Sequence, residues 1–155
     1  MTTELGVEAI RAWLAGHDIT VQELPADTST AISAAAALGT SVPTIVKSLL
    51  FMADGVPLLV LASGDRRVNT RALAREIGAR KVRMATRDEC IAHAGYAPGG
   101  VPPVGHREVL RALLDRRLLD FPVVYAAAGS PHAVFAITPH QLHTLTGAEL
   151  TDAAE

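Results

Sequence analysis

A thirteen-residue segment, 94–106, holds four glycines and three prolines. Proline removes a backbone donor and glycine weakens regular structure, so this density excludes both a helix and a central strand. We expect a long loop whose course is fixed by its prolines. Its glycines let a ligand approach the backbone, where exposed N–H groups can hold a phosphate or an oxyanion. A purely structural turn explains the same composition, because Gly/Pro clusters mark turns first.

The length and composition predict a single domain spanning residues 1–155. Apolar residues make up 49% of the chain and aromatic residues 4%, so alanine and aliphatic side chains must fill the core. No apolar run approaches the roughly 20 residues that cross a bilayer, and the N-terminus lacks the pattern of a signal peptide. Cys90 is the only cysteine, which excludes an internal disulfide. A cytoplasmic protein with no membrane partner is expected.

Periodicity and turn residues predict the order of the helices and strands. Helices are expected at residues 6–16, 31–38, 70–77, 86–93 and 139–146. Strands are expected at residues 19–24, 44–53, 56–62, 81–84, 121–127 and 133–137, the last being the final strand. Residues 109–119 have helical periodicity, although 109–114 also fits a strand. A hairpin turn at Asp54-Gly55 and the absence of a regular βαβ rhythm favour an α+β domain with a mixed sheet.

Positive charge is concentrated in one part of the chain, although the net charge is −2. That net charge argues against nucleic-acid binding through bulk charge alone. Eight of the 14 Lys and Arg residues lie within residues 66–87, where Glu76 is the only acid. They are Arg66, Arg67, Arg71, Arg75, Arg80, Lys81, Arg83 and Arg87. The cluster can bind phosphates, or it can be the solvated face of a surface helix.

Lys47 interrupts an otherwise largely apolar predicted strand, 44–53. A buried ammonium group is costly unless it has an anionic partner, so this lysine is a candidate to meet a ligand phosphate or a developing negative charge. The alternative is an outward-facing lysine that limits edge-to-edge aggregation.

Other common catalytic arrangements are not supported by the sequence. The chain has no HExxH, GxSxG, Walker or GxGxxG motif and no Cys/His spacing typical of zinc. His140 and His143 are three residues apart on a predicted helix, a pattern more often exposed than metal-binding. Cys90 lies in the middle of a predicted helix and is expected to be a packing residue. No metal, no cofactor and no covalent Ser or Cys hydrolase is therefore predicted.

Three segments in order resemble the YbaK / prolyl-tRNA-synthetase-associated editing domain family. Residues 30–39 resemble its alanine-rich helix that ends in glycine. Residues 45–49 (Ile-Val-Lys-Ser-Leu) resemble its lysine-bearing strand. Residues 95–105 resemble its loop with the pattern Gly-Gly-x-x-Pro-x-Gly. The resemblance spans about residues 19–145, most of the chain, and is closest to the free-standing members.

This resemblance implies a mixed, barrel-like β-sheet flanked by helices and a metal-independent aminoacyl-tRNA deacylase. The implied substrate is mischarged tRNA, in particular tRNA-Pro carrying Cys, Ala, Ser or Thr. The implied partners are tRNA and prolyl-tRNA synthetase, without DNA. The implied catalytic residues are Lys47, Gly99 and Gly100. The implied substrate-binding residues are Pro102, Gly105, Gly129 and His132. Pro102 stands where many members have serine, which changes a polar contact.

The chemistry of an activated ester fits these residues. Because an aminoacyl ester needs no protein nucleophile, a site has to place the terminal adenosine and stabilise the oxyanion. Backbone N–H groups near Gly99 and Gly100 suit the oxyanion, and Lys47 suits either the terminal phosphate or the oxyanion. We expect Arg66, Arg67, Arg71 and Arg75 to bind the tRNA. Two alternatives remain: a non-catalytic module that binds tRNA or a synthetase, and a small-molecule pocket protein unrelated to RNA.

Overall fold

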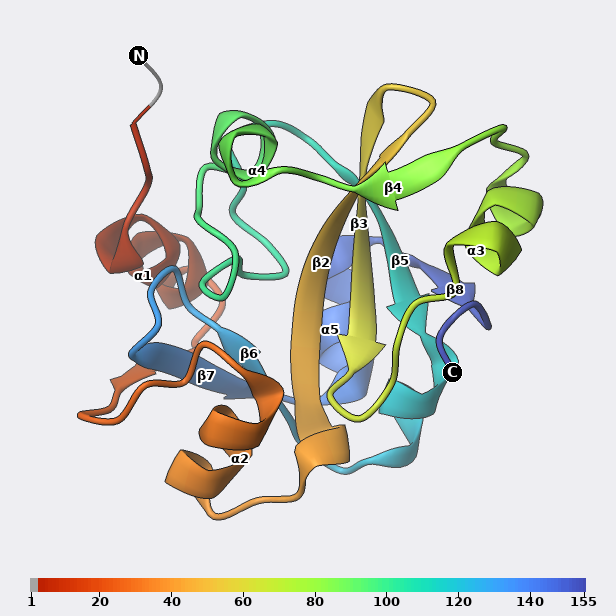
Figure 1. Ribbon diagram of the computed structural model, residues 1–155. Helices are drawn as coiled ribbons and strands as arrows, with labels where there is room; N and C mark the ends of the chain where they lie inside the picture. The colour runs from red at the N-terminus through yellow and green to blue at the C-terminus, as the bar shows by residue number, and fades with distance from the viewer. Residues whose placement is uncertain (1–2) are drawn as a thin grey trace.

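The computed structural model describes residues 3–155 (Figure 1). Five α-helices lie in this range: α1 (Val7–Ala15), α2 (Ala31–Leu38), α3 (Thr70–Ile77), α4 (Arg87–His93) and α5 (Pro139–Thr146). Two short 3-10 helices accompany them, η1 (Val42–Thr44) and η2 (Arg116–Asp120). Within the described range, no helix is long and apolar enough to cross a bilayer.

Eight strands form one mixed sheet: β1 (Val21–Glu23), β2 (Ile45–Ala53), β3 (Val56–Ser63), β4 (Val82–Met84), β5 (Arg111–Asp115), β6 (Val124–Ala127), β7 (Ala133–Ile137) and β8 (Glu149–Thr151). The hydrogen-bonding order is β1-β7-β6-β2-β3-β5-β8, and β4 pairs with β2 outside this path. The β2–β3 hairpin is antiparallel, whereas β6, β5 and β8 each join a neighbour in parallel. The mixed sheet flanked by helices confirms the predicted fold class, and the sheet is open because β1 and β8 are its two ends.

The two faces of β2 pack against different elements. Val46 and Leu50 belong to the larger core, which includes side chains from α1, α5 and the 94–106 loop. Phe51, on the other face, joins a second core with Leu73 of α3. Ile45, on that same second face, packs against Ala34 and Ala35 of α2. Figure 1 shows α2 near the start of β2 and α3 near its far end, with the middle of the strand between them.

Local signals placed the helix ends correctly. Thr30 and Thr86 cap α2 and α4 with reciprocal side-chain bonds, and Gly39, Gly78 and Gly147 end helices in the left-handed conformation that favours glycine. Glu89 completes the second capping box and also pairs with Arg83 at 2.7 Å. The hydrogen bond from Arg83 lowers the pKa of Glu89 to about 2.

Of the two interpretations of residues 109–119, the helix was wrong and the strand over 109–114 was confirmed in part. Residues 111–115 form β5, which lies between β3 and β8, and only 116–120 coil, as the 3-10 helix η2. Ala112, Leu113 and Leu114 are buried on both faces of the sheet. Such a strand is continuously apolar, so its sequence does not distinguish it from a buried helix. The expectation that 133–137 is the final strand was also wrong, because the three-residue β8 follows α5.

Gly64 lies where the chain leaves β3 and passes against η1, α2 and β2. A Cβ atom at this position would lie 2.3 Å from the Val42 carbonyl oxygen and 3.0 Å from the Ala31 Cβ. We expect Gly64→Ala to lower the free energy of unfolding by about 1–3 kcal/mol, because η1 and α2 must move apart to admit the methyl group. Urea denaturation followed by circular dichroism measures the change.

Gly16→Ala is the matched control for this prediction. Gly16 has φ −67°, and its added Cβ would meet only the Trp13 carbonyl oxygen, at 3.7 Å. Its unfolding free energy should stay within about 0.5 kcal/mol of the parent. Equal stability of both variants would contradict the tight contact at Gly64.

Candidate functional site

A cavity of about 240 Å³ opens between α2, the first half of β2, strands β6 and β7, and the 94–106 loop. Most of the side chains around it are small. Its lining residues are Thr28, Ser29, Thr30, Ala31, Ala34, Ile45, Val46, Lys47, Ser48, Leu49, Gly99, Val101, Tyr125, Ala126, Ala127 and Val134. The cavity thus brings together the three segments that carry the family resemblance.

The cavity lies at a gap in the pairing along one edge of β2. This edge pairs with β6 at Ile45 and Val46, and with β4 only from Phe51 onward. The carbonyl of Leu50 points to the same edge, where it accepts a hydrogen bond from the Ala85 N–H at 2.9 Å. Alternate residues of a strand direct their backbone groups to one edge, so the N–H and C=O of Ser48 point into the gap between the two ladders. The sheet therefore offers backbone polar groups at the cavity.

Ser48 also carries a buried side-chain oxygen in this region. Among the residues the structure describes, its Oγ is the one buried side-chain polar atom with no hydrogen-bond partner. An unpaired buried hydroxyl is costly, and such groups are found where a ligand supplies the missing partner or where strain is stored. No pattern in the sequence indicated this, because a serine in a strand is ordinary.

Lys47 and Gly99, two of the three predicted catalytic residues, line the same cavity. Lys47 is half-buried, and its Nζ donates a hydrogen bond to the Arg66 carbonyl oxygen. Burial lowers the pKa of Lys47 below its ordinary value of 10.5, with Arg67 adding to this and the carboxylates of Asp65 and Asp115 opposing it. The amine is therefore a partly desolvated cation at a cavity wall.

The backbone groups of Gly100, the third predicted catalytic residue, already form hydrogen bonds within the protein. Its N–H donates to the Ala97 carbonyl at 3.1 Å, and its carbonyl accepts from the Gly129 N–H at 2.9 Å. A Cβ at Gly100 would lie 3.2 Å from the Ser130 nitrogen, so glycine is needed for this close approach. The Gly100 amide thus already has an acceptor, whereas no acceptor is found for the Gly99 amide among residues 3–155.

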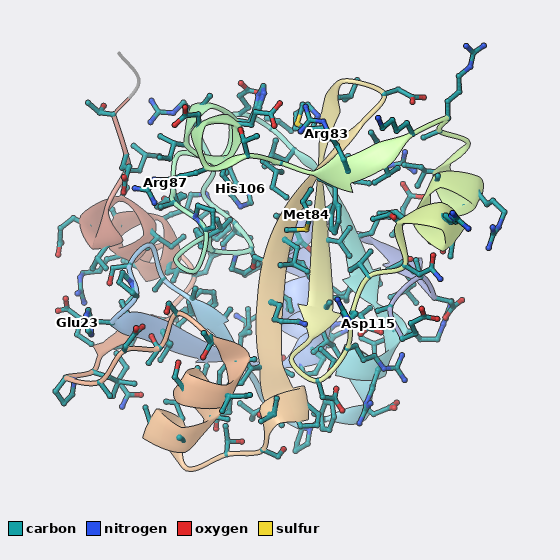
Figure 2. The ribbon with its side chains drawn as sticks, viewed as in Figure 1. Glu23, Arg83, Met84, Arg87, His106 and Asp115 are labelled. Carbon is teal, nitrogen blue, oxygen red and sulfur yellow. The ribbon has the colours of Figure 1, made fainter. Side chains whose placement is uncertain are left out.

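The predicted substrate-binding residues lie outside the cavity lining. The carbonyls of Pro102 and Gly105 accept hydrogen bonds from His106 Nε2 at 2.6 Å and Tyr96 Oη at 3.0 Å. Burial lowers the pKa of His106, and its Nε2 carries the donated proton because a carbonyl oxygen can only accept. Figure 2 shows His106 within the loop, far from Asp115 at the end of β5. These bonds hold the loop in place as one wall of the cavity.

The turn that follows β6 supports this loop from the other side. Gly129 has φ +89°, and an added Cβ would lie 3.1 Å from both the Gly6 carbonyl and Tyr96 Cε1. His132 is exposed, and its Nδ1 lies 3.1 Å from the Ala26 carbonyl oxygen. The structure thus gives both residues packing contacts near the cavity rather than a place in its lining.

The basic segment 66–87 divides into paired and free cations. Arg66 forms an ion pair with Asp115 at 3.5 Å, Arg83 with Glu89 at 2.7 Å and Arg87 with Glu4 at 3.1 Å. Arg67, Arg71 and Arg75 are exposed, and no acidic group within residues 3–155 pairs with them. The last two lie on one side of α3, four residues apart, as predicted.

Several cavity residues were not singled out from the sequence. Thr28, Ser29 and Thr30 were interpreted only as helix caps, yet they also form the rim beside Gly99. Tyr125 of β6 reaches the site through its parallel pairing with Ile45. Tyr125 and Ile45 are 80 positions apart in the chain, and no local pattern encodes their contact. No group of three metal-ligating side chains is found in the described range.

Replacing Ser48 tests whether its hydroxyl is unpaired. We expect Ser48→Ala to raise the free energy of unfolding by about 1 kcal/mol, because the variant no longer buries an unsatisfied polar group. Ser63→Ala is the matched control, since the Ser63 hydroxyl is buried and donates to the Pro43 carbonyl at 2.6 Å. That variant should lose about 1 kcal/mol. Equal destabilisation of both variants in urea would show that Ser48 has a partner.

A family model described as an aminoacyl-tRNA editing domain matches residues 25–145. The chain is 31% identical over 131 residues to YwhH, an uncharacterized protein of Bacillus subtilis strain 168, covering 84% of this chain and 82% of that protein. It is 40% identical over 81 residues to a proline–tRNA ligase of Nitratidesulfovibrio vulgaris strain DP4, where the match spans 52% of this chain and only 14% of the ligase.

A crystal structure described as a candidate trans-editing enzyme for prolyl-tRNA synthetase has the same fold. It superposes on this chain with a TM-score of 0.90 at 42% sequence identity, and 96% of each chain is covered. The matched range of the family model includes Lys47, Gly99 and every other residue that lines the cavity. The chain therefore belongs to the aminoacyl-tRNA editing domain family.

Proposed function

We propose that this protein is a trans-editing deacylase, which hydrolyses the ester of a mischarged tRNA-Pro that carries a small amino acid. The observation that carries the proposal is the cavity that a half-buried lysine, Lys47, and Gly99 of the glycine loop both line. The family and the similarity to a candidate trans-editing enzyme for prolyl-tRNA synthetase support the same activity. Prolyl-tRNA synthetase is the partner expected to supply the mischarged tRNA.

The size of the cavity favours a small aminoacyl group. Its volume of about 240 Å³ has to accept both the amino acid and part of the terminal adenosine. Alanine side chains at positions 31, 34, 126 and 127 leave this space open. Cysteine, alanine, serine and threonine esters are the candidates, and a difference of one methylene group changes binding by roughly 1–3 kcal/mol.

The proposed reaction is attack of water on the ester carbonyl. The carbon–oxygen bond to the ribose breaks, the ribose oxygen takes a proton, and free tRNA and amino acid leave. The negative charge that develops on the carbonyl oxygen needs donors already in place. Lys47 supplies a cation at the cavity wall, for this oxyanion or for the terminal phosphate. The Gly99 amide suits the oxyanion better than the Gly100 amide, which already donates to Ala97.

The main test is amino-acid release from a panel of mischarged tRNAs, by the native protein and by Lys47→Ala. We expect Lys47→Ala to lower kcat/KM by roughly 100-fold, the usual effect of removing one preorganised group that stabilises the transition state. Lys81→Ala is the matched control, because Lys81 is the only other lysine and lies outside the cavity. Its rate should equal the parent rate.

Two results would overturn parts of this proposal. Equal activity of the native protein and Lys47→Ala would remove the role of Lys47. Tight tRNA binding with no ester cleavage across the panel would favour the alternative, a non-catalytic module that binds tRNA or a synthetase.

Capture of tRNA is proposed to use the exposed cations Arg67, Arg71 and Arg75, with Arg66 supporting the same surface. We expect the double variant Arg71→Gln/Arg75→Gln to weaken tRNA binding and to flatten its dependence on salt. The log–log slope should fall by about one unit for each phosphate that the variant no longer neutralises. Binding is measured by filter retention at several salt concentrations.

The double variant Arg111→Gln/Arg116→Gln carries the same change in net charge and is the control. Both of these arginines are already paired, with Glu149 at 3.2 Å and with Asp152 at 3.0 Å. Equal loss of affinity in the two double variants would mean that net charge, rather than the α3 surface, decides tRNA binding.

A further inference from the structure

We propose that Asp115 is a positioning residue for Lys47: it fixes the turn at residues 63–67 so that the Arg66 carbonyl holds the Lys47 amine at the cavity wall. The inference rests on the proposed function in one respect, namely that Lys47 acts in that cavity. Asp115 is not among the cavity residues, so it acts through the turn rather than on the substrate.

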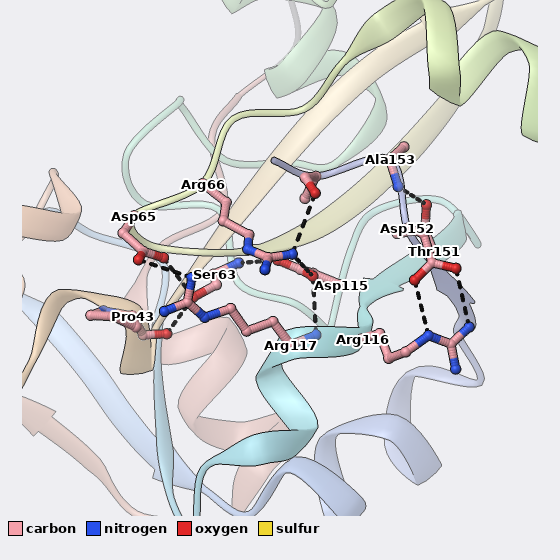
Figure 3. Close-up of polar contacts among 11 residues, drawn as sticks. Pro43, Ser63, Asp65, Arg66, Asp115, Arg116, Arg117, Thr151, Asp152 and Ala153 are labelled. Carbon is pink, nitrogen blue, oxygen red and sulfur yellow. Dashed lines mark hydrogen bonds and ion pairs between the residues drawn. The ribbon is translucent and has the colours of Figure 1, made fainter.

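Asp115 is a buried carboxylate with three donors around it. Its side chain is 1% exposed, at the end of β5. Oδ2 accepts from the Ser63 N–H at 3.0 Å, Oδ1 accepts from the Arg117 N–H at 3.1 Å, and the Arg66 guanidinium lies 3.5 Å from Oδ1 (Figure 3). A buried charge is tolerated only with such compensation, so these partners are fixed relative to one another.

The turn is held from both ends. At its start, the Ser63 hydroxyl donates to the Pro43 carbonyl at 2.6 Å, and the Arg66 N–H donates back to the Ser63 carbonyl at 2.9 Å. At its end, Arg67 and Glu155 exchange two backbone hydrogen bonds, both of 2.7 Å. The Arg66 carbonyl lies between these two sets of hydrogen bonds, so it is a fixed acceptor for the Lys47 ammonium.

Asp115 also sets part of the electrostatic environment of that ammonium. Burial lowers the pKa of Lys47, the Arg67 guanidinium adds to this, and the carboxylates of Asp65 and Asp115 oppose it. Two more charged groups lie in the same cluster, the Arg66 guanidinium and Arg117, which pairs with Asp65 at 3.1 Å. A neutral residue at 115 therefore removes one of the two negative charges that oppose the effect of burial.

A nearby ion pair provides an internal comparison. Arg116 and Asp152 pair at 3.0 Å on the adjoining segment, and Asp152 is 73% exposed (Figure 3). This pair does not reach the 63–67 turn, and Asp152 is not among the groups that shift the pKa of Lys47. Asp152→Asn is thus the same chemical change as Asp115→Asn without a connection to the site.

The first experiment measures the Lys47 amine directly and needs no tRNA. The chain has two lysines, Lys47 and Lys81, so Lys81→Arg leaves a single lysine signal in a carbon-13 NMR titration of the lysine ε-methylene. In this background we expect Asp115→Asn to move the titration midpoint to lower pH by roughly half a unit or more, since an opposing negative charge is lost. Asp152→Asn should leave the midpoint unchanged.

The second experiment measures the pH profile of deacylation. Asp115→Asn should lower kcat/KM by roughly tenfold, the effect of weakening a hydrogen bond to a charged group. Its alkaline limb should move to lower pH together with the NMR midpoint. A purely structural role would lower the rate at every pH and leave the limb in place.

The outcomes separate this inference from the proposed function. An unchanged midpoint in a folded Asp115→Asn overturns the positioning role, whatever the activity. A shifted midpoint in a protein without deacylase activity supports the positioning of Lys47 and counts against the proposed reaction. If Asp115→Asn does not fold, Arg66→Gln keeps Asp115, the Arg66 carbonyl and the Ser63 N–H bond to Asp115, and removes the guanidinium contact with Asp115. It should then lower kcat more than it raises KM, and parent-like kinetics would overturn the inference.

Discussion

The hydrogen-bonding edge of β2 is the constraint on which the site depends. One long strand pairs with β3 from Val46 to Ala53, while its other edge is shared by β6 at the start and β4 at the end. A sheet edge that is paired throughout leaves no backbone groups for a ligand. Here the β6 and β4 pairings are separated along β2, and the stretch around Ser48 between them lines the cavity. The order of strand pairing alone therefore leaves backbone hydrogen-bonding groups available at the site.

The glycine- and proline-rich loop contributes mainly by its packing. Gly100 lies against Gly129 and Ser130, and Tyr96 is fully buried with its hydroxyl on the Gly105 carbonyl. The interpretation as a structural turn thus applies to Tyr96, Gly100 and Gly105, and the interpretation as a ligand-facing loop applies to Gly99. The loop's hydrogen bonds fix it in place, and that rigidity lets Gly99 face the cavity opposite the β2 edge.

Electrostatics at the site follow from how Lys47 is buried. The amine lies between carboxylates that favour its charge and a desolvated wall that disfavours it. Arg66 connects the amine to the carboxylates, because its carbonyl accepts a hydrogen bond from the Lys47 ammonium while its guanidinium pairs with Asp115. The cation thus depends on β5 and on the C-terminal segment that pairs with the 63–67 turn, although neither reaches the cavity.

The sequence by itself determined the features that local chemistry decides. The helix caps at Thr30 and Thr86 and the hairpin at Asp54-Gly55 depend on neighbouring residues, and the sequence predicted them. The lysine within an apolar strand and the family resemblance were likewise visible in short segments. Tertiary structure alone decided that residues 111–115 are a strand, because a fully buried strand and a buried helix share one apolar pattern. It alone decided the gap in pairing at Ser48 and the link from Asp115 to Lys47, since the contacts that form them join residues 19 to 80 positions apart. Such contacts depend on the free energy of the whole sheet, which no short segment encodes.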